Sequence, residues 1–275
     1  MSNVREPAVA GTFYPAHPAS LSQQVREFLS RAEPKRIEGE IKALVSPHAG
    51  YIYSGGVAAY GYRLLQDSNY DLVAVISPSH RVYFPGLSIW DGEAYRTPLG
   101  RIEVAQEEVR DLISSYPFIS YHPQAHSQEH ALEVQLPFLQ VVLEGFRLIP
   151  IIMGDQGYDS CQRASQALAK VLKGKRALTV ASSDLSHYHP YSVAKSLDQV
   201  VIEDINDFDP QKLGEDISQG RSEACGAGPV ITAMLASQTL GADRAEVLHY
   251  ANSGDVVGDK GAVVGYLSAV IYKSK

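Results

Sequence analysis

Three short apolar runs in the chain, each ending in serine, are followed within five residues by a histidine. They are residues 41–46 with His48, residues 72–77 with His80, and residues 177–182 with His187. Such runs are typical of buried strands in a mostly parallel sheet. Ligands of open α/β sheets bind outside the carboxyl ends of the strands. The pattern therefore predicts that the three imidazoles meet at one sheet edge, and we interpret their meeting point as a metal site.

Apolar residues recur at helical spacing between these runs, and further strands follow toward the end of the chain. The expected helices are residues 20–32, about 57–66, about 160–172, and most of residues 191–240. The additional expected strands are residues 146–153, 245–251 and 262–272. No linker or fixed-period repeat interrupts this order. We therefore predict one domain over residues 1–275, of the α/β class, with a central, mostly parallel mixed sheet flanked by helices.

One further expected helix contains a proline. Leucines repeat at helical spacing through residues 129–143, and Pro137 lies inside that segment. Proline removes a backbone donor and clashes with the preceding turn of a helix. The sequence therefore predicts a kink at Pro137, unless the helix begins later than residue 129.

Composition and charge disfavour several classes of partner. A net charge of −7 over 275 residues, with a pI near 5.7, argues against nucleic acid or an anionic membrane as the main partner. No apolar run reaches the length that spans a bilayer. The only basic cluster, within residues 170–176, is typical of a solvated helix end. With two cysteines and no signal peptide, we expect a cytoplasmic protein without a disulfide framework.

His48 and His80 are the leading candidate ligands. Each follows a proline that rigidifies the turn at a strand end, so the positions of the imidazoles are expected to be well fixed. Neutral imidazole is the commonest metal ligand and suits iron, copper and zinc. The alternative is a pair of hydrogen-bonded loop histidines with no ligand.

Cys225 is the third candidate ligand. It lies four residues before Pro229, which suits the first turn of the apolar helix that follows. A helix N-terminus lowers the pKa of a thiol and favours the thiolate that binds metals. The alternative is a small buried apolar residue, which is also our interpretation of Cys161.

Polar groups in two other segments are expected near these ligands. Asp184 and His187, with His189 beyond them, follow the third strand, where a carboxylate beside imidazoles acts as a ligand, an orienting group or a general base. Asp184 is equally suited to cap a helix. We favour a functional role for Asp184 and His187, because this segment leaves the same sheet edge as His48.

Residues 126–130 match the pattern H-x-x-E-H, the inverted signature of zinc peptidases. Pro123 and Ser127 place this segment at a helix start, whereas the signature requires both imidazoles on one face of a formed helix. Ser127 and Glu129 are interpreted as capping residues. A peptidase is therefore disfavoured, but His130 is expected to face the site.

Several long motifs together resemble the Memo family of proteins, which occurs in bacteria, archaea and animals. The motifs are PAVAGTFYP (residues 7–15), PHAGYIYSG (47–55), SPSH (77–80), EHALEVQLPF (129–138), SSDLSHY (182–188), Cys225-Gly226, NSGDV (252–256) and VVGY (263–266). The resemblance runs nearly from end to end, and it implies a fold similar to the class III extradiol ring-cleaving dioxygenases.

Those dioxygenases hold a non-haem iron with two histidines and a glutamate. The resemblance implies that His48, His80 and Cys225 fill the corresponding positions here, with a thiolate in place of the carboxylate. Thiolate favours softer metals and is itself oxidisable, so dioxygenase activity is not carried over with the fold. His130, Asp184 and His187 are the expected acid/base or outer groups of the site.

The resemblance leaves two functions open. Animal members have been described as phosphotyrosine-peptide binders and as copper- or iron-binding redox proteins, and microbial relatives often occur alongside a radical-SAM protein. We expect one iron or copper ion and redox chemistry on a small organic substrate, in a metal-dependent oxidoreductase. The alternative is a binding module that recognises a peptide or metabolite in the former active-site cleft without turnover.

Overall fold

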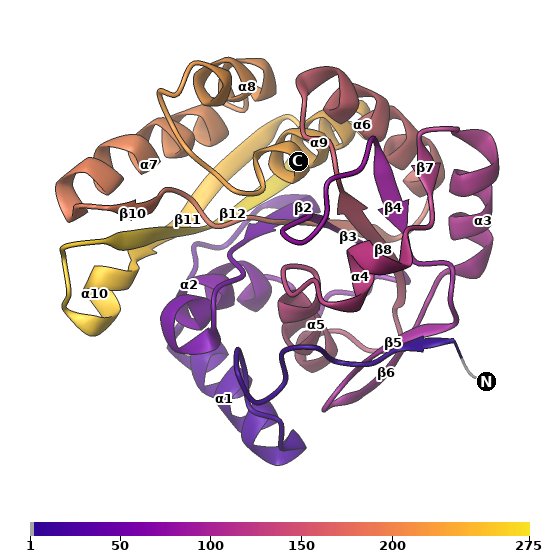
Figure 1. The fold of residues 1–275 in the computed structure, drawn as a ribbon, viewed down its shortest axis with the longest axis horizontal. Helices are drawn as coiled ribbons and strands as arrows, with labels where there is room; N and C mark the ends of the chain where they lie inside the picture. Colours follow the sequence, from indigo (N-terminus) through magenta and orange to yellow (C-terminus); the bar gives the residue numbers. More distant parts are fainter. Residues whose placement is uncertain (1–2) are drawn as a thin grey trace.

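A computed structural model describes residues 3–275 as a mixed nine-stranded sheet with helices on both faces, beside a three-stranded sheet (Figure 1). The strands are β1 (Val4–Arg5), β2 (Gly39–Ser46), β3 (Leu72–Pro78), β4 (Leu87–Ile89), β5 (Ala94–Thr97), β6 (Gly100–Glu103), β7 (Ile119–Ser120), β8 (Arg147–Met153), β9 (Ala177–Ser182), β10 (His187–His189), β11 (Arg244–Asn252) and β12 (Val263–Ser274). The helices are α1 (Pro18–Arg31), α2 (Tyr51–Arg63), α3 (Gln106–Ser115), α4 (Pro123–Ser127), the short 3₁₀ helix η1 (Glu133–Gln135), α5 (Leu136–Val142), α6 (Tyr158–Leu172), α7 (Tyr191–Asn206), α8 (Pro210–Ser218), α9 (Ala227–Thr239) and α10 (Ser253–Val257).

The centre of the large sheet is parallel and its flanks are largely antiparallel. Its order is β10-β12-β2-β9-β3-β8-β4-β7, and β11 pairs with β12 outside this path. Strands β2, β9, β3 and β8 run parallel to one another, whereas β12 and β4 pair antiparallel with the ends of this group. The predicted α/β class, with a mostly parallel centre in a mixed sheet, is confirmed.

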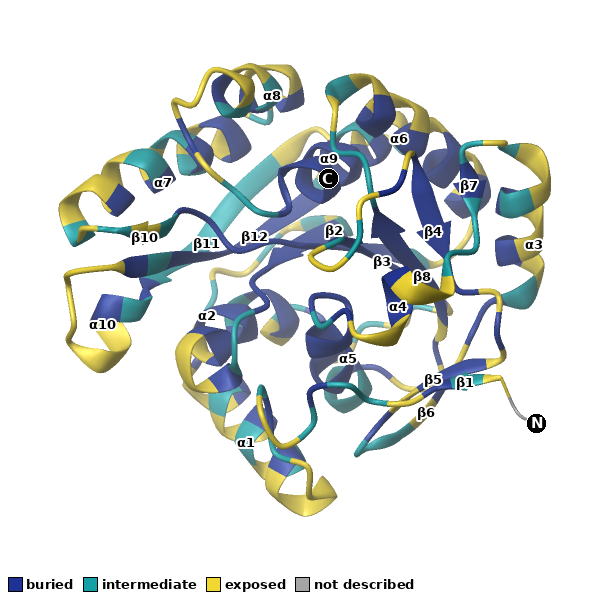
Figure 2. Cartoon of the chain, in the orientation of Figure 1, coloured by how far each residue is buried: buried dark blue, intermediate teal, exposed yellow. Residues whose placement is uncertain are grey.

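The central strands are buried toward their carboxyl ends because helices cover both faces of the sheet. All seven residues of β3 are buried, and α9 packs on β3 and β9, whereas α2 packs on β2 from the opposite face of the sheet (Figure 2). A strand that is buried on both faces reads as a continuous hydrophobic run rather than an alternating one. This burial explains why the strand ends were visible in the sequence pattern.

The register of the parallel strands aligns their carboxyl ends. Ser46 of β2 pairs with Ser182 of β9, and Ala181 pairs with Ile76 of β3. The residues that follow these three strands therefore leave the sheet at one level. This alignment brings His48, His80 and the segment after Ser182 to the same edge.

Two helix predictions need correction. The segment 129–143 is not one helix: residues 129–132 are not helical, η1 follows, and α5 begins at Leu136. Pro137 consequently lies in the first turn of α5, where its missing N–H costs nothing and no kink is needed. Helix α2 begins at Tyr51, earlier than the expected residue 57, directly after Gly50.

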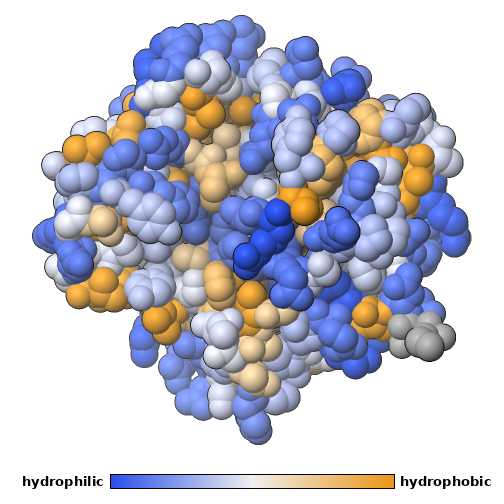
Figure 3. Space-filling model, viewed as in Figure 1, coloured by the Kyte–Doolittle hydropathy of each residue, from blue (hydrophilic) through white to orange (hydrophobic). Residues whose placement is uncertain are grey.

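The helices are short and the surface is mixed in polarity. The longest described helix, α7, has 16 residues, and none within residues 3–275 is both long and apolar enough to cross a membrane. Figure 3 shows small groups of apolar side chains separated by polar ones over the visible face. The exposed large apolar residues are Ile52, Tyr53, Tyr83, Tyr188, Val193, Val256 and Val257.

Candidate metal centre

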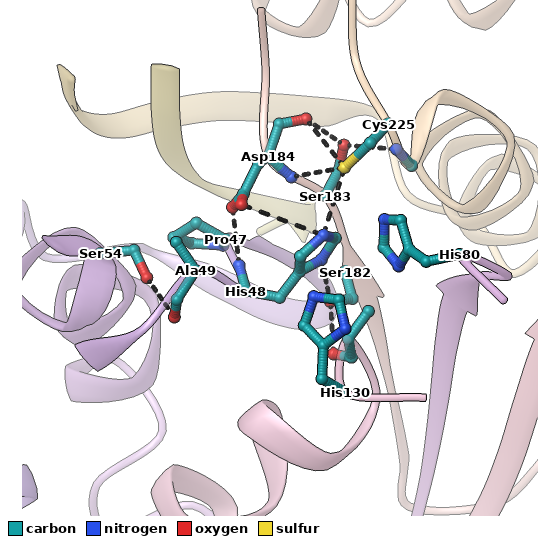
Figure 4. Close-up of polar contacts among 12 residues, drawn as sticks. Pro47, His48, Ala49, Ser54, His80, His130, Ser182, Ser183, Asp184 and Cys225 are labelled. Atoms are coloured by element: carbon teal, nitrogen blue, oxygen red, sulfur yellow. Dashed lines mark hydrogen bonds and ion pairs between the residues drawn. The ribbon is translucent and has the colours of Figure 1, made fainter. Parts of the chain in front are cut away.

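The structure brings His48, His80 and Cys225 together at the carboxyl edge of the sheet. Their candidate ligand atoms all lie within 4.8 Å of one another. The imidazole centroids of His48 and His80 are 5.1 Å apart, and Cys225 Sγ lies 3.2 Å from His48 Nε2. Figure 4 shows the side chains pointing toward one another from the ends of β2 and β3 and from the segment before α9. Three donor atoms at this spacing can contact one ion.

A hydrogen-bond chain fixes which ring nitrogen of His48 faces the site. Ser182 Oγ donates to the carbonyl of Ala131 (2.7 Å) and accepts from Gln135 Nε2 (2.8 Å). The amide of Gln135 cannot be reversed, because Nε2 also donates to the carbonyl of Pro47 (3.0 Å). The remaining lone pair of Ser182 therefore accepts from His48 Nδ1, 2.8 Å away. His48 Nε2 is left unprotonated and directed at Cys225.

His80 is held by a carboxylate that the sequence analysis interpreted as a helix cap. Glu129 Oε1 lies 2.9 Å from His80 Nδ1, and Oε2 accepts from the backbone N–H of His80 at 2.7 Å. Contacts with His80 and backbone N–H groups hold the pKa of Glu129 at about 2, against the opposing effect of burial. The capping interpretation was wrong, because residues 129–132 are not helical and the next helix, η1, begins only at Glu133.

The thiol of Cys225 is surrounded by the backbone of Asp184. Sγ accepts from the N–H of Asp184 (3.3 Å) and lies 3.5 Å from its carbonyl oxygen. Burial and the nearby Asp184 carboxylate raise the pKa of the Cys225 thiol. The expected lowering by a helix N-terminus was therefore wrong. Helix α9 begins two residues later, and the N–H groups of Gly226 and Gly228 are already bound by Ser183 and Gln156.

The buried imidazoles are neutral at physiological pH. Burial lowers the pKa of His48 to about 3 and that of His130 to about 4, and the neighbouring imidazoles add to both effects. Neutral imidazoles carry the lone pair that a metal ion needs. His48 is therefore ready to bind a cation, whereas Cys225 must first lose a proton.

Two further predicted site residues, His130 and Asp184, lie around this cluster. The ring of His130 stacks on His80 at 4.8 Å and lies 5.5 Å from His48. Asp184 Oδ2 is 4.0 Å from His48 Nε2, and Oδ1 accepts from the backbone N–H of His48 at 2.7 Å. Burial raises the pKa of Asp184. Asp184 precedes β10 and not a helix, so it is not a helix cap.

His187 and His189 occupy different environments on β10. His187 is half-buried, and its Nδ1 lies 2.7 Å from the carbonyl oxygen of Leu185. His189 instead pairs with Glu223 at 2.9 Å, and both side chains are partly exposed. His187 thus lies three residues after Asp184, which contacts His48, whereas His189 lies at the partly exposed rim.

The histidine at the other end of the H-x-x-E-H pattern points elsewhere. His126 is fully buried, and its ring nitrogens lie 2.6 Å from Tyr95 Oη and 2.9 Å from Ser88 Oγ. The pattern spans the end of α4 and the loop after it, so His126 and His130 do not share a helix face. This geometry agrees with the expectation that the segment is not a peptidase site.

Sequence reasoning did not assign a role to Glu129, Ser182 or Gln135 at the site. All three are buried and hydrogen-bonded directly or through one another to the histidines. Ser182 ends an apolar strand, and Glu129 directly precedes a candidate histidine. A polar residue at the end of an apolar strand, or beside a candidate ligand, is the signal that could have identified Ser182 and Glu129, whereas Gln135 has no such signal.

Comparisons with known proteins identify the family. A MEMO1 family protein of Methanocaldococcus jannaschii is 38% identical over 287 aligned positions, which cover 98% of this chain and 100% of the relative. MEMO1 family proteins of Methanosarcina mazei (39%; 98% and 99% covered) and Nitrosopumilus maritimus (35%; 96% and 98% covered) are similarly related. The crystal structure of an uncharacterized protein from Escherichia coli K12 matches with a TM-score of 0.56 at 14% identity, covering 84% of this chain and 99% of that one, which shows the fold alone. Residues 5–270 match the family model described as Memo-like protein, and the chain belongs to this family.

Proposed function

We propose that the protein binds one iron or copper ion through His48, His80 and Cys225 and carries out redox chemistry on a small organic substrate. The observation that carries this proposal is the convergence of two imidazoles and one thiol within 4.8 Å. Membership of the Memo-like family supports it. The proposed activity is that of a metal-dependent oxidoreductase.

The donor set fits such an ion. Imidazole suits iron and copper, and thiolate favours the softer of the biological metals. The hydroxyl of Ser182 orients His48 and the carboxylate of Glu129 orients His80, as outer groups commonly do for metal-binding histidines. Three protein ligands leave coordination positions open, so a bound ion would supply an accessible redox centre.

The surrounding residues of the chain supply proton chemistry. Asp184 lies 4.0 Å from His48 Nε2, and its raised pKa suits a carboxyl group that takes up and releases protons. His130 is a neutral imidazole stacked on His80, and the centroid of its ring lies 4.8 Å from that of Phe13. We assign Asp184 and His130 to proton exchange with the substrate. We assign His187 to proton exchange between these groups and the solvent.

The setting proposed for this chemistry is the cytoplasm. Both cysteines are free, as a reducing compartment would keep them, and the acidic chain is poorly suited to nucleic acid or an anionic membrane. The expected partner is therefore a small molecule or a peptide. A pathway shared with a radical-SAM protein is part of this proposal.

Metal analysis of protein purified without oxygen tests the first half of the proposal. The parent should carry close to one equivalent of iron or copper after reconstitution, and Cys225→Ser should carry much less. Oxygen and peroxide consumption with a panel of small organic substrates tests the second half. Turnover in the parent that Cys225→Ser lacks supports an oxidoreductase, whereas ligand binding without turnover in either protein supports the binding module.

A further inference from the structure

The carboxylate of Glu129 is buried, and among the described residues no lysine or arginine side chain lies beside it to balance its charge. Its exposed fraction is 1%, and within residues 3–275 its carboxylate contacts no such group. Three backbone N–H groups bind it instead: that of His80 at Oε2 (2.7 Å), and those of His130 (2.9 Å) and Ala131 (3.0 Å) at Oε1. A buried carboxylate in such a setting is costly unless every lone pair direction is used.

Both oxygens of Glu129 thus act as acceptors toward the backbone. Oε1 also lies 2.9 Å from His80 Nδ1 and 3.2 Å from His130 Nδ1, and because an ionised carboxylate only accepts, the imidazole of His80 is the donor in the shorter contact. In the neutral imidazole, a proton on Nδ1 leaves Nε2 of His80 with its lone pair. That nitrogen is the one available to the site shared with His48 and Cys225.

We propose that Glu129 is the positioning residue for His80: it fixes the Nδ1–H tautomer and the ring orientation, and it strengthens Nε2 as a donor to the metal ion. This inference rests on the proposed function in that the bound ion is the one proposed above. A carboxylate behind a ligating imidazole raises the basicity of the imidazole. His48 has only the neutral hydroxyl of Ser182 in the equivalent place, so His80 is the stronger of the two nitrogen donors.

A purely structural role would make Glu129 equivalent to its neighbour Glu133. Glu133 is also fully buried, and it binds the backbone N–H groups of Ala8 and Val9, the hydroxyl of Tyr14 and the guanidinium of Arg5. It contacts no imidazole among the described residues. Glu133→Gln is therefore a matched control, because it removes a buried charge that holds backbone without touching a candidate ligand.

The first measurement uses the metal-free parent protein and needs no variant. Nitrogen-15 NMR of the histidine rings distinguishes the two neutral tautomers of each imidazole. We expect His80 in the Nδ1–H form. A metal-free parent in which His80 carries its proton on Nε2 overturns the inference, whatever the protein does with metals.

The second measurement is an anaerobic Fe²⁺ titration of the parent, Glu129→Gln and Glu133→Gln, with chemical denaturation of each metal-free protein. Glu129→Gln should bind Fe²⁺ about 10–100-fold more weakly and show a mixture of His80 tautomers. Glu133→Gln should be less stable but keep the parent's Fe²⁺ affinity and tautomer. Equal Fe²⁺ affinity in the parent and Glu129→Gln, or an equal loss in both variants, overturns the inference.

Failure of the proposed function has a different signature. A parent that binds neither Fe²⁺ nor Cu⁺ refutes the metal centre, and the tautomer spectra of parent and Glu129→Gln then decide the positioning role alone. If Glu129→Gln fails to fold, Glu129→Asp keeps the charge. Glu129→Asp should retain the parent's His80 tautomer, and its Fe²⁺ affinity should fall less than that of a variant that lacks a ligand. An Nε2–H tautomer of His80 in Glu129→Asp overturns the inference.

Discussion

The cluster around His48 and the cluster around His126 are both buried groups of rings and hydroxyls, yet they differ in one respect. Both ring nitrogens of His126 contact hydroxyl groups, those of Tyr95 and Ser88. His48 has one nitrogen on Ser182, and its other nitrogen faces the thiol of Cys225. His126 has no lone pair left for a ligand, whereas His48 does.

Burial and pKa do not distinguish the two clusters. Burial lowers the pKa of His126 and of His48 alike, to about 3 in each case, and both side chains are almost completely inaccessible. A perturbed pKa is therefore a poor guide to function in this protein, although such values often mark active sites. The partner of the second ring nitrogen is the better criterion. The following variants test that criterion.

Alanine at His48 and at His126 should have opposite consequences. His48→Ala removes a ligand. Replacing a residue that only orients a ligand costs up to about 100-fold in metal affinity, so we expect the Fe²⁺ affinity of His48→Ala to fall by more than that. His126→Ala leaves the hydroxyls of Tyr95 and Ser88 unpaired and opens a cavity, so the free energy of unfolding should fall by about 2–4 kcal/mol. Anaerobic titration and chemical denaturation measure the two effects. Loss of Fe²⁺ affinity in both variants would refute the distinction.

Two buried aspartates permit a similar contrast at lower amplitude. Asp184 accepts from the backbone N–H of His48, and Asp198 accepts from the N–H of Ser186 and the hydroxyl of Tyr250. Asp184→Asn should weaken Fe²⁺ binding by about 10–100-fold without abolishing it. Asp198→Asn should lower stability and leave Fe²⁺ affinity intact. Unchanged affinity in Asp184→Asn would reduce Asp184 to a residue that holds the turn.

The pH dependence of metal binding should come from the thiol rather than from His48. The pKa of His48 is lowered, so this ligand is already neutral near pH 7, but the pKa of Cys225 is raised, so its proton must leave when a metal binds. The affinity for metal should therefore rise about tenfold per pH unit between about pH 7 and pH 8.5. This range lies above the reference pKa of histidine, about 6.5, so the slope reports the proton of the thiol. Fe²⁺ titrations at several pH values measure the slope. A flat profile would show that Cys225 does not bind as thiolate.

The sequence predicted the elements that bury continuous apolar runs and the residues at their ends. Strand β9 was predicted with its observed bounds, and His48 and His80 were placed at one edge because parallel strands share a direction. The sequence could not predict the partner of His80. An acidic residue in a loop after one helix cannot be distinguished, in the sequence alone, from an acidic residue that caps the next helix. Glu129 is 49 positions from His80 along the chain.

The ionisation of Cys225 was mispredicted for a related reason. Proximity to helix α9 is visible in the sequence, but the carboxylate and backbone that surround the thiol belong to Asp184, 41 positions away. Burial and that carboxylate outweigh the effect of the helix end. Local signals thus identified the ligand candidate, and tertiary contacts determine its protonation.

The smallest expected effect concerns the second cysteine. Cys161 is fully buried in α6, and burial raises the pKa of its thiol to about 11. Cys161→Ala should cost about 1 kcal/mol of stability and leave Fe²⁺ affinity unchanged, because it removes only a small buried group.

Peroxide treatment sharpens the same contrast between the cysteines. Sulfinic or sulfonic acid at Cys225 would present oxygen in place of sulfur and change the metal preference of the site. Cys161→Ala should keep this sensitivity and Cys225→Ala should lose it, as measured by Fe²⁺ and Cu⁺ titrations before and after treatment. Because the reactive form is the thiolate and the pKa of Cys225 is raised, modification of the metal-free protein should be slow near pH 7 and accelerate as pH rises. Equal sensitivity in Cys225→Ala would place the oxidisable group elsewhere and remove the thiol from the proposed centre.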